Sequence, residues 1–162
     1  MLSGGDWAVW RGLRLAALSE APYAFGSKLA DWQGDGDRER RWRDRLEIPG
    51  SRNLVAVLDG VASGMASGVP GDSADVVEII SLWVSPAARG KGVADRLIEE
   101  IEAWAVRSCR AKTLRLEVTP GNGSAIALYR RHGFADTGEL GDPAPGGLGR
   151  ELVMAKTLGA AE

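Results

Sequence analysis

The chain has 162 residues, a formal net charge of −2 at pH 7 and a pI of about 5.5. Its 44% hydrophobic and 26% charged residues are ordinary for a globular protein with a sizeable core, which argues against a disordered or fibrous chain. The slight negative charge argues against nucleic acid or an anionic membrane surface as partner. We expect one domain over residues 1–162.

Cysteine usage and the amino terminus bear on location and on metal binding. Cys109 is the only cysteine, so no internal disulfide can form, and the sequence has no Cys–His pair at metal-ligand spacing. We therefore expect no metal site. No apolar run approaches the roughly 18 residues that cross a bilayer, and the first residues do not resemble a signal peptide. These features predict a cytoplasmic protein.

The first third of the sequence predicts two helices. Asp6 is a candidate cap for a helix over 7–18, where apolar residues recur with the helical period, and Pro22 follows its end. A second helix is expected over 38–47, where interleaved arginines and acidic residues are typical of a solvated face.

The middle of the chain predicts strands. Two short runs, 53–58 and 61–69, flank Asp59-Gly60, a dipeptide that tolerates the positive φ of a tight hairpin. Residues 75–84 are almost continuously apolar, which is expected of a central strand buried on both faces.

The second half alternates helices and strands. Residues 92–106 have the apolar period of an amphipathic helix, and 113–118 alternate like a strand. A short helix is expected over 122–133. A loop rich in glycine and proline at 140–149 then precedes a last strand over 150–158.

The segment SPAARGKGVADRL, residues 85–97, joins the central strand to the amphipathic helix. A strand end, a glycine-containing turn and a helix start together direct unpaired backbone amides and the positive end of the helix dipole at one spot. Gly90 and Gly92 allow a close approach of the backbone, and Ala94 keeps the first helical turn slim. The spacing favours a phosphate site and a plain strand-to-helix turn about equally.

Two familiar phosphate-binding motifs do not fit this loop. Lys91 is followed by Gly92 rather than Ser or Thr, so the sequence does not form a nucleoside-triphosphate P-loop. A dinucleotide fingerprint needs Gly or Ala where Asp95 stands.

Two other motifs do fit. RGKGVA at 89–94 matches R/Q-x-x-G-x-G/A, and NGSAIALYRRHGF at 122–134 matches N-x-x-A-x-x-L-Y-x-x-x-G-F. On these motifs the chain resembles a bacterial member of the GCN5-related N-acetyltransferase (GNAT) superfamily, from about Trp7 to Leu158. The first motif is the coenzyme A signature of that family.

The resemblance implies a fold. It is an α/β (α+β) GNAT fold, in which a central, mixed, mostly antiparallel twisted sheet of about six strands has helices on both faces and a splay between the family's strands four and five. One departure concerns the sheet edge: members usually begin with a strand before the first helix, and here only a few residues precede Asp6.

The resemblance also implies a site for acetyl-CoA. In the family the pantetheine arm pairs with the splayed end of the fourth strand, and the pyrophosphate sits on the amides of the loop. Asn122 is expected to bind the pantetheine or to cap its helix, and the side chains of Arg89 and Lys91 contact phosphate or solvent. The implied coenzyme-binding residues are Leu82, Trp83, Val84, Arg89, Gly90, Lys91, Gly92, Val93, Ala94, Asn122 and Tyr129.

Two residues are candidates for the proton transfers that acyl transfer to an amine requires. Tyr129 matches the family's tyrosine near the coenzyme sulfur and is the candidate general acid; the alternative is a core tyrosine. Strict alternation places Glu78 on the strand face of Leu82 and Val84, where a carboxylate is rare unless it has a partner or a task. It resembles the family's strand-four glutamate, a base; the alternative is a carboxylate that binds the substrate cation. We expect Glu78 to be mostly buried and on the same side of the sheet as Tyr129.

The expected function is transfer of an acetyl group from acetyl-CoA to a primary amine by direct attack in a ternary complex. A small-molecule acceptor is favoured, with a protein amino terminus or lysine as the alternative. An alternative of a different class is a non-catalytic acyl-CoA sensor; Tyr129 and Glu78 together favour the enzyme. We expect no nucleic acid or membrane partner, and a homodimer is compatible with the sequence.

Overall fold

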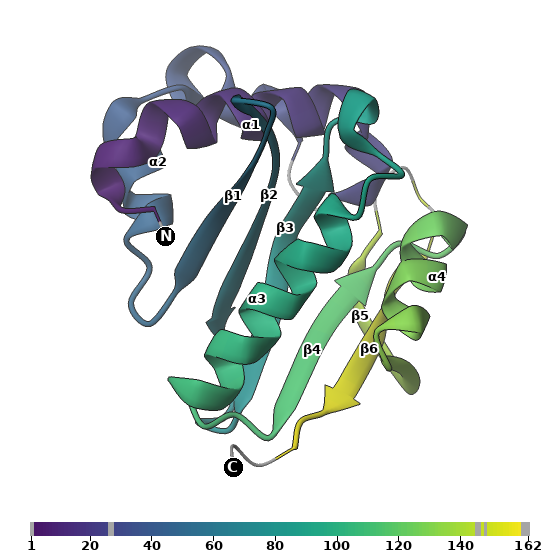
Figure 1. The fold of residues 1–162 in the computed structure, drawn as a ribbon. Helices are drawn as coiled ribbons and strands as arrows, with labels where there is room; N and C mark the ends of the chain where they lie inside the picture. Colours follow the sequence, from purple (N-terminus) through teal and green to yellow (C-terminus); the bar gives the residue numbers. More distant parts are fainter. Residues whose placement is uncertain (1, 26–27, 145–146, 148, 160–162) are drawn as a thin grey trace.

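One sheet of six strands organises the molecule, in the order β1-β2-β3-β4-β6-β5 (Figure 1). The computed structural model describes residues 2–25, 28–144, 147 and 149–159. Only β3 and β4 run parallel, and the other four pairings are antiparallel. The expected mixed, mostly antiparallel sheet is confirmed. The strands are β1 (Arg52–Leu58), β2 (Val61–Pro70), β3 (Val76–Val84), β4 (Thr113–Val118), β5 (Ala135–Pro143) and β6 (Arg150–Thr157).

Helices cover both faces of this sheet, as expected. In Figure 1, α3 lies in front of the sheet and α1 runs across the top of the view. A larger core cluster packs α3 and α4 against the sheet, and a smaller cluster joins α1 and α2 to Met65 and Trp83. None of the described helices is both long and apolar enough to cross a membrane. The helices are α1 (Trp7–Glu20), α2 (Glu39–Leu46), α3 (Val93–Arg107) and α4 (Gly123–Arg131).

The first helix begins where the sequence predicts. Asp6 is its N-cap residue, but its carboxylate accepts a hydrogen bond from the amide of Ser3 at 2.8 Å instead of capping the helix. The buried side chains Trp10, Leu13 and Ala17 recur with the helical period on the face that packs against the sheet. The chain turns away at Pro22, where a proline cannot continue the hydrogen-bond ladder.

The edge of the sheet beside β1 reflects the departure from the family pattern. Among the described residues no strand precedes α1. The amide of Leu2 donates a hydrogen bond to the carbonyl of Asn53 in β1 at 3.0 Å. The sheet therefore has β1 as its terminal strand on this side.

The sequence-based expectation of a loop over 140–149 is wrong for its first part, because β5 extends to Pro143. Nearly every residue of β5 is exposed, so it has no apolar alternation that sequence reasoning could detect. Backbone pairing with β6, interrupted by register shifts on both sides of Leu140, holds it at the sheet edge. Of the remaining loop, residues 145, 146 and 148 lie outside the described residues.

The strands β3 and β4 pair only at their beginnings, from Val76 to Glu78 on β3. Beyond that point β3 contains a bulge: Met65 of β2 pairs with Trp83, whereas Ser67 pairs with Ile80. Ser81 takes a positive φ of 58° within it. The expected splay between the family's strands four and five is therefore found between β3 and β4.

The bulge also changes which side chains share a face. Before it, Val77 and Ile79 belong to the larger core cluster; after it, Val84 belongs to that cluster and Trp83 to the smaller one. The prediction that Glu78 shares a face with Leu82 and Val84 is wrong, because the extra residue shifts the alternation by one.

A glycine in β2 lets α3 lie close to the sheet. A Cβ on Gly68 would stand 2.5 Å from the ring of Trp104 and 3.1 Å from Ile101. Gly12 is a control, because a Cβ there meets no atom within 4 Å. We predict that Gly68→Ala lowers the free energy of unfolding by about 1–3 kcal/mol through overpacking. Gly12→Ala, in a helix, should raise it by about 0.5–1 kcal/mol. Urea unfolding measures both, and equal stability of the two variants would contradict the close packing.

Candidate active site

The loop between β3 and α3 presents an open backbone surface. Gly90 and Gly92 have positive φ angles of 77° and 79°, and Gly92 is the N-cap residue of α3. The first helical bond runs from the Arg96 amide to the Gly92 carbonyl at 3.1 Å, so the amides before it have no partner within the helix. A Cβ on either glycine would meet no atom within 4 Å. The loop can therefore receive an anion on its amides.

The side chain of Arg89 is held by the protein itself. Its guanidinium binds both carboxylate oxygens of Glu20, at 2.7 and 3.1 Å, and its Nε donates to the carbonyl of Val84 at 3.1 Å. Trp83 also donates to Glu20, at 3.0 Å. These hydrogen bonds hold the pKa of Glu20 below its ordinary value. Glu20, which the sequence reasoning did not single out, ties the end of α1 to the loop, whereas Lys91 is exposed.

The end of β3 offers main-chain groups rather than side chains. Trp83 is buried in the smaller core cluster, and Leu82 and Val84 pack against the larger one. Pairing with β4 ends at Glu78, so the edge of β3 beyond this residue faces the splay instead of a neighbouring strand. An extended ligand could pair there as an added strand does.

A cavity of about 640 Å³ lies where the splay meets the amino-terminal helices. Glu78 and Tyr129, the two predicted catalytic residues, both line it. Around them are aromatic, charged and smaller side chains from α1, α2, the strands β3, β4, β5 and β6, and the segment between α1 and α2. These include Trp10, Arg14, Phe25, Trp32, Trp42, Arg45, Ser81, Leu82, Glu117, Asp142 and Glu151.

Tyr129 reaches the cavity from the larger core cluster, where its ring packs edge-on against Phe134 at 6.0 Å between centroids. Burial raises the pKa of Tyr129 to about 12, so its hydroxyl keeps its proton at neutral pH. Glu78 alternates with Val77 and Ile79, which belong to the same core cluster as Tyr129. Its side chain therefore points to the opposite face of the sheet from that cluster. The expectation that Glu78 and Tyr129 share a side of the sheet is wrong; they line one cavity because the strands separate.

Glu78 is mostly enclosed, with 21% of its side chain exposed. It faces Arg115 on β4, and the guanidinium Nη1 lies 3.3 Å from its Oε2. Burial raises the pKa of Glu78 above its ordinary value, although Arg115 acts in the opposite direction. The carboxylate is therefore both paired and poised to take a proton more readily than a surface glutamate.

Two further carboxylates, Glu117 of β4 and Glu151 of β6, line the cavity beside Glu78. Glu151 is only 8% exposed, and burial together with the charge and hydrogen bond of Glu117 raises its pKa to about 7. Neither was predicted from the sequence. The argument applied to Glu78 also fits Glu151, which shares a strand face with Val153 and Ala155. It does not fit Glu117, which lies on the polar face of an alternating strand.

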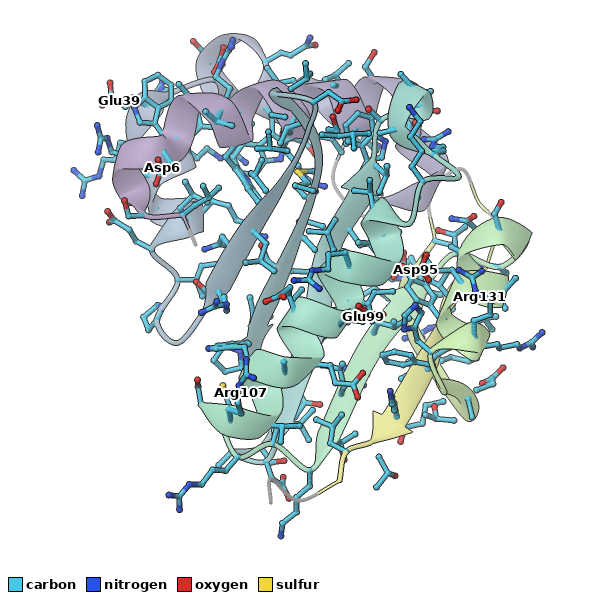
Figure 2. The ribbon with its side chains drawn as sticks, viewed as in Figure 1. Asp6, Glu39, Asp95, Glu99, Arg107 and Arg131 are labelled. Carbon is cyan, nitrogen blue, oxygen red and sulfur yellow. The ribbon has the colours of Figure 1, made fainter. Side chains whose placement is uncertain are left out.

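The beginning of α3 is also joined to the end of α4. Asp95 accepts hydrogen bonds from Arg131 at 2.8 Å and contacts the Nε2 of His132 at 2.7 Å. Figure 2 shows Asp95 and Arg131 facing each other between the two helices. Asn122 is the N-cap residue of α4, but its side chain makes no capping hydrogen bond. The ion pair fixes the helix that carries Tyr129 relative to the glycine loop.

The raised pKa of Glu151 predicts a pH dependence of stability. A carboxyl whose pKa rises from 4.5 to about 7 on folding stabilises the fold fully below pH 4.5, and this contribution is lost as the pH rises to about 7. We predict that Glu151→Gln removes this loss, so the variant gains stability over the parent at pH 8. Urea unfolding at a series of pH values measures it, with exposed Glu99→Gln (Figure 2) as the charge-matched control. An unchanged pH slope in Glu151→Gln would contradict the burial of this charge.

Comparisons with known proteins agree with this arrangement. Residues 15–134 match the acetyltransferase (GNAT) family. An IAA acetyltransferase of Azospirillum brasilense is 36% identical over 113 residues, which cover 70% of this chain and 72% of that protein. An aminoglycoside N(6′)-acetyltransferase type 1 of Salmonella typhimurium is 30% identical over 136 residues, covering 79% and 84%.

The fold is shared with solved structures. The structure of yncA from Salmonella typhimurium, determined with its cofactor acetyl-CoA, superposes with a TM-score of 0.77 at 24% identity, over 100% of this chain and 94% of that one. The family match over most of the chain, together with these two relatives, establishes that this protein belongs to the GNAT family of acetyltransferases.

Proposed function

We propose that this protein transfers the acetyl group of acetyl-CoA to a primary amine of a small molecule, by direct attack in a ternary complex. The observation that carries the proposal is the cavity at the splay, which both Tyr129 and Glu78 line. All described strands belong to one sheet, which supports a single domain over residues 1–162.

The loop and the strand end fit acetyl-CoA, which supplies the activated acetyl thioester. The amides of residues 90–94 would hold its pyrophosphate at the start of α3, because the Arg89 amide already donates to the carbonyl of Pro86 at 3.3 Å. The free edge of residues 82–84 would pair with its pantetheine arm. Glu20 already binds the guanidinium of Arg89. We therefore assign the phosphate contacts to the backbone and to exposed Lys91 rather than to Arg89.

Tyr129 and Glu78 are proposed for the two proton movements. The substrate ammonium gives a proton to the Glu78 carboxylate, directly or through one water, and the neutral amine attacks the thioester carbonyl carbon. As the carbon–sulfur bond breaks, the hydroxyl of Tyr129 donates its proton to the departing sulfur. The second proton of the attacking nitrogen then passes, directly or through water, to the Tyr129 oxygen, which leaves the amide and the free thiol. Glu117 and Glu151 add negative charge that favours a cationic amine in the cavity.

The shape of the cavity supports a small-molecule acceptor. A volume of about 640 Å³ is within the range of small-molecule sites, and its walls combine aromatic rings with a few charged groups. The two relatives described above are named for small molecules, IAA and an aminoglycoside. A protein amino terminus is the competing acceptor, and an amine panel with detection of the released thiol separates the two classes.

The loop assignment predicts that Gly92→Val weakens acetyl-CoA binding by at least about tenfold, because its side chain occupies the space beside the amides and its φ disfavours a β-branched residue. Gly60→Val is the matched control: Gly60 has a φ of 80° and equally open surroundings in the β1–β2 hairpin. Isothermal titration with acetyl-CoA measures both. Unchanged affinity in a folded Gly92→Val protein would refute the loop assignment.

The chemical assignment predicts different effects for two conservative variants. Tyr129→Phe keeps the buried ring and should lower kcat by about 10- to 1000-fold, with little change in coenzyme affinity. Glu78→Gln should remove the acidic limb of the pH profile of kcat/KM. Steady-state thiol release across pH measures both variants.

Each part can fail separately. Full turnover in Tyr129→Phe would make Tyr129 a core residue only. A Glu78→Gln variant with a raised amine KM, an unchanged kcat and an intact acidic limb would make Glu78 a binding group for the ammonium. Coenzyme binding without thiol release from any amine would favour the sensor.

A further inference from the structure

The cavity contains a buried arginine that no carboxylate neutralises. Arg14 of α1 is only 8% exposed, and its Nη1 has no hydrogen-bond partner among the described residues. Its guanidinium lies over the ring of Phe25, with 4.6 Å to the centroid. Burial and the nearby charge of Arg45 lower the pKa of Arg14 to about 10, so it still carries its charge at neutral pH.

A second cation, Arg45 of α2, lies on the same side of the cavity. Its guanidinium donates to Asn53 and to the hydroxyls of Ser67 and Ser81, each at 3.1 Å. All three acceptors are neutral, and they hold the group in place without cancelling its charge. Burial lowers the pKa of Arg45 to about 10 as well. In the described part of the chain, no carboxylate oxygen lies within 4.0 Å of a nitrogen of either guanidinium.

This arrangement is unusual energetically. A buried charge is normally paired, because removing it from water without a counterion costs several kcal/mol. Trp10, fully buried on the same wall, has an indole Nε1 that likewise finds no partner among the described residues. The side of the cavity built by α1 and α2 therefore has hydrogen-bond donors without an acceptor and positive charges without a carboxylate partner among the described residues.

The opposite wall has the complementary charge. Glu78, Glu117 and Glu151 come from the strands, and Arg115 forms ion pairs with Glu78 and Glu117. The cavity therefore has its cationic side chains Arg14 and Arg45 on the helices and its acidic side chains on the strands of the sheet. Aromatic side chains, among them Phe25 and Trp42, also line the cavity.

We propose that the acyl acceptor is an amino carboxylate, whose carboxylate binds Arg14 beside Arg45 while its ammonium faces Glu78, Glu117 and Glu151. The proposal rests on the proposed function and names the substrate class of the same site. A planar guanidinium with a free Nη is suited to donate hydrogen bonds to a carboxylate. A polyamine or another wholly cationic amine would bring positive charge against the arginine wall, which disfavours such acceptors.

The test compares acids with their own amides. The pairs are L-methionine and L-methioninamide, L-phenylalanine and L-phenylalaninamide, and β-alanine and β-alaninamide, assayed by thiol release from acetyl-CoA. The amine of an amino acid amide is less basic than that of the acid, so intrinsic reactivity at neutral pH favours the amide. We expect at least one pair in which the acid has a kcat/KM about tenfold or more above that of its amide.

The variant Arg14→Met removes the charge and keeps an apolar chain against Phe25. It should abolish the preference for the acid through a raised KM for the acid, while the Kd for acetyl-CoA stays unchanged. Arg14→Lys keeps the charge without the planar guanidinium, so its preference for the acid over the amide should lie between those of the parent and Arg14→Met. Arg40→Met, on α2 with a side chain 93% exposed, is the control and should behave like the parent.

A binding measurement separates this inference from the proposed function. In the presence of coenzyme A, the preferred amino acid should raise the Tm of the parent, and this shift should be lost in Arg14→Met and retained in Arg40→Met. Thiol release without any acid preference, or an acid preference that survives Arg14→Met, overturns the inference and leaves the acetyltransferase standing. If no amine causes thiol release, the proposed function is overturned. In that case the Tm shift alone tests whether Arg14 binds a carboxylate.

Discussion

The separation of β3 from β4 after Glu78 is the constraint on which the site depends. A continuous sheet would bury both strand edges in hydrogen bonds and would close the space between its two faces. Here pairing stops at Glu78, and one extra residue at Ser81 bends β3 away. A positive φ at a serine costs about 1–2 kcal/mol, and such strain persists where the surrounding structure holds it. The hydroxyl of Ser81 is held by Arg45, which links the bulge to α2. The splay lets groups from opposite faces of the sheet, Tyr129 and Glu78, reach one cavity.

The local features of the fold were predictable because they depend on near neighbours in the chain. Helical periodicity located α1 and α3, and the strand–glycine–helix pattern located the loop with its two positive-φ glycines. The features that were missed depend on pairing across the sheet. β5 has no apolar alternation of its own, and the bulge at Ser81 is visible only in the register with β2. The wrong face predicted for Leu82 and Val84 follows directly from that extra residue, because a shift of one exchanges the two faces of a strand.

The same distinction applies to the site residues. A carboxylate in an apolar strand was recognisable in Glu78, and the same rule finds Glu151, whereas Glu117 lies on the polar face of an alternating strand. Arg14 is different: it stands four positions after Trp10 and three before Ala17, so the helical period places it on the buried face of α1 although it is charged. The packing of α1 over Phe25 and beside α2 encloses its side chain. The lack of a carboxylate near Arg14 could not be predicted from a local sequence pattern, because it depends on every element around the cavity.

The charges of the cavity are also consistent with how an amine must be handled before transfer. Carboxylates with raised pKa values lie on the sheet side, near the splay where the thioester would enter, and the paired Arg115 keeps Glu78 from becoming neutral too easily. Arg14 and Arg45, which also line the cavity, belong to the helices α1 and α2. In the mechanism proposed above, an ammonium attracted to the carboxylates of the strands would lie near Glu78, the group proposed to take its proton, whereas a substrate held only by the aromatic rings would have no fixed orientation. Charges of both signs in a partly enclosed cavity would then supply both the orientation of the amine and the acceptor for its proton.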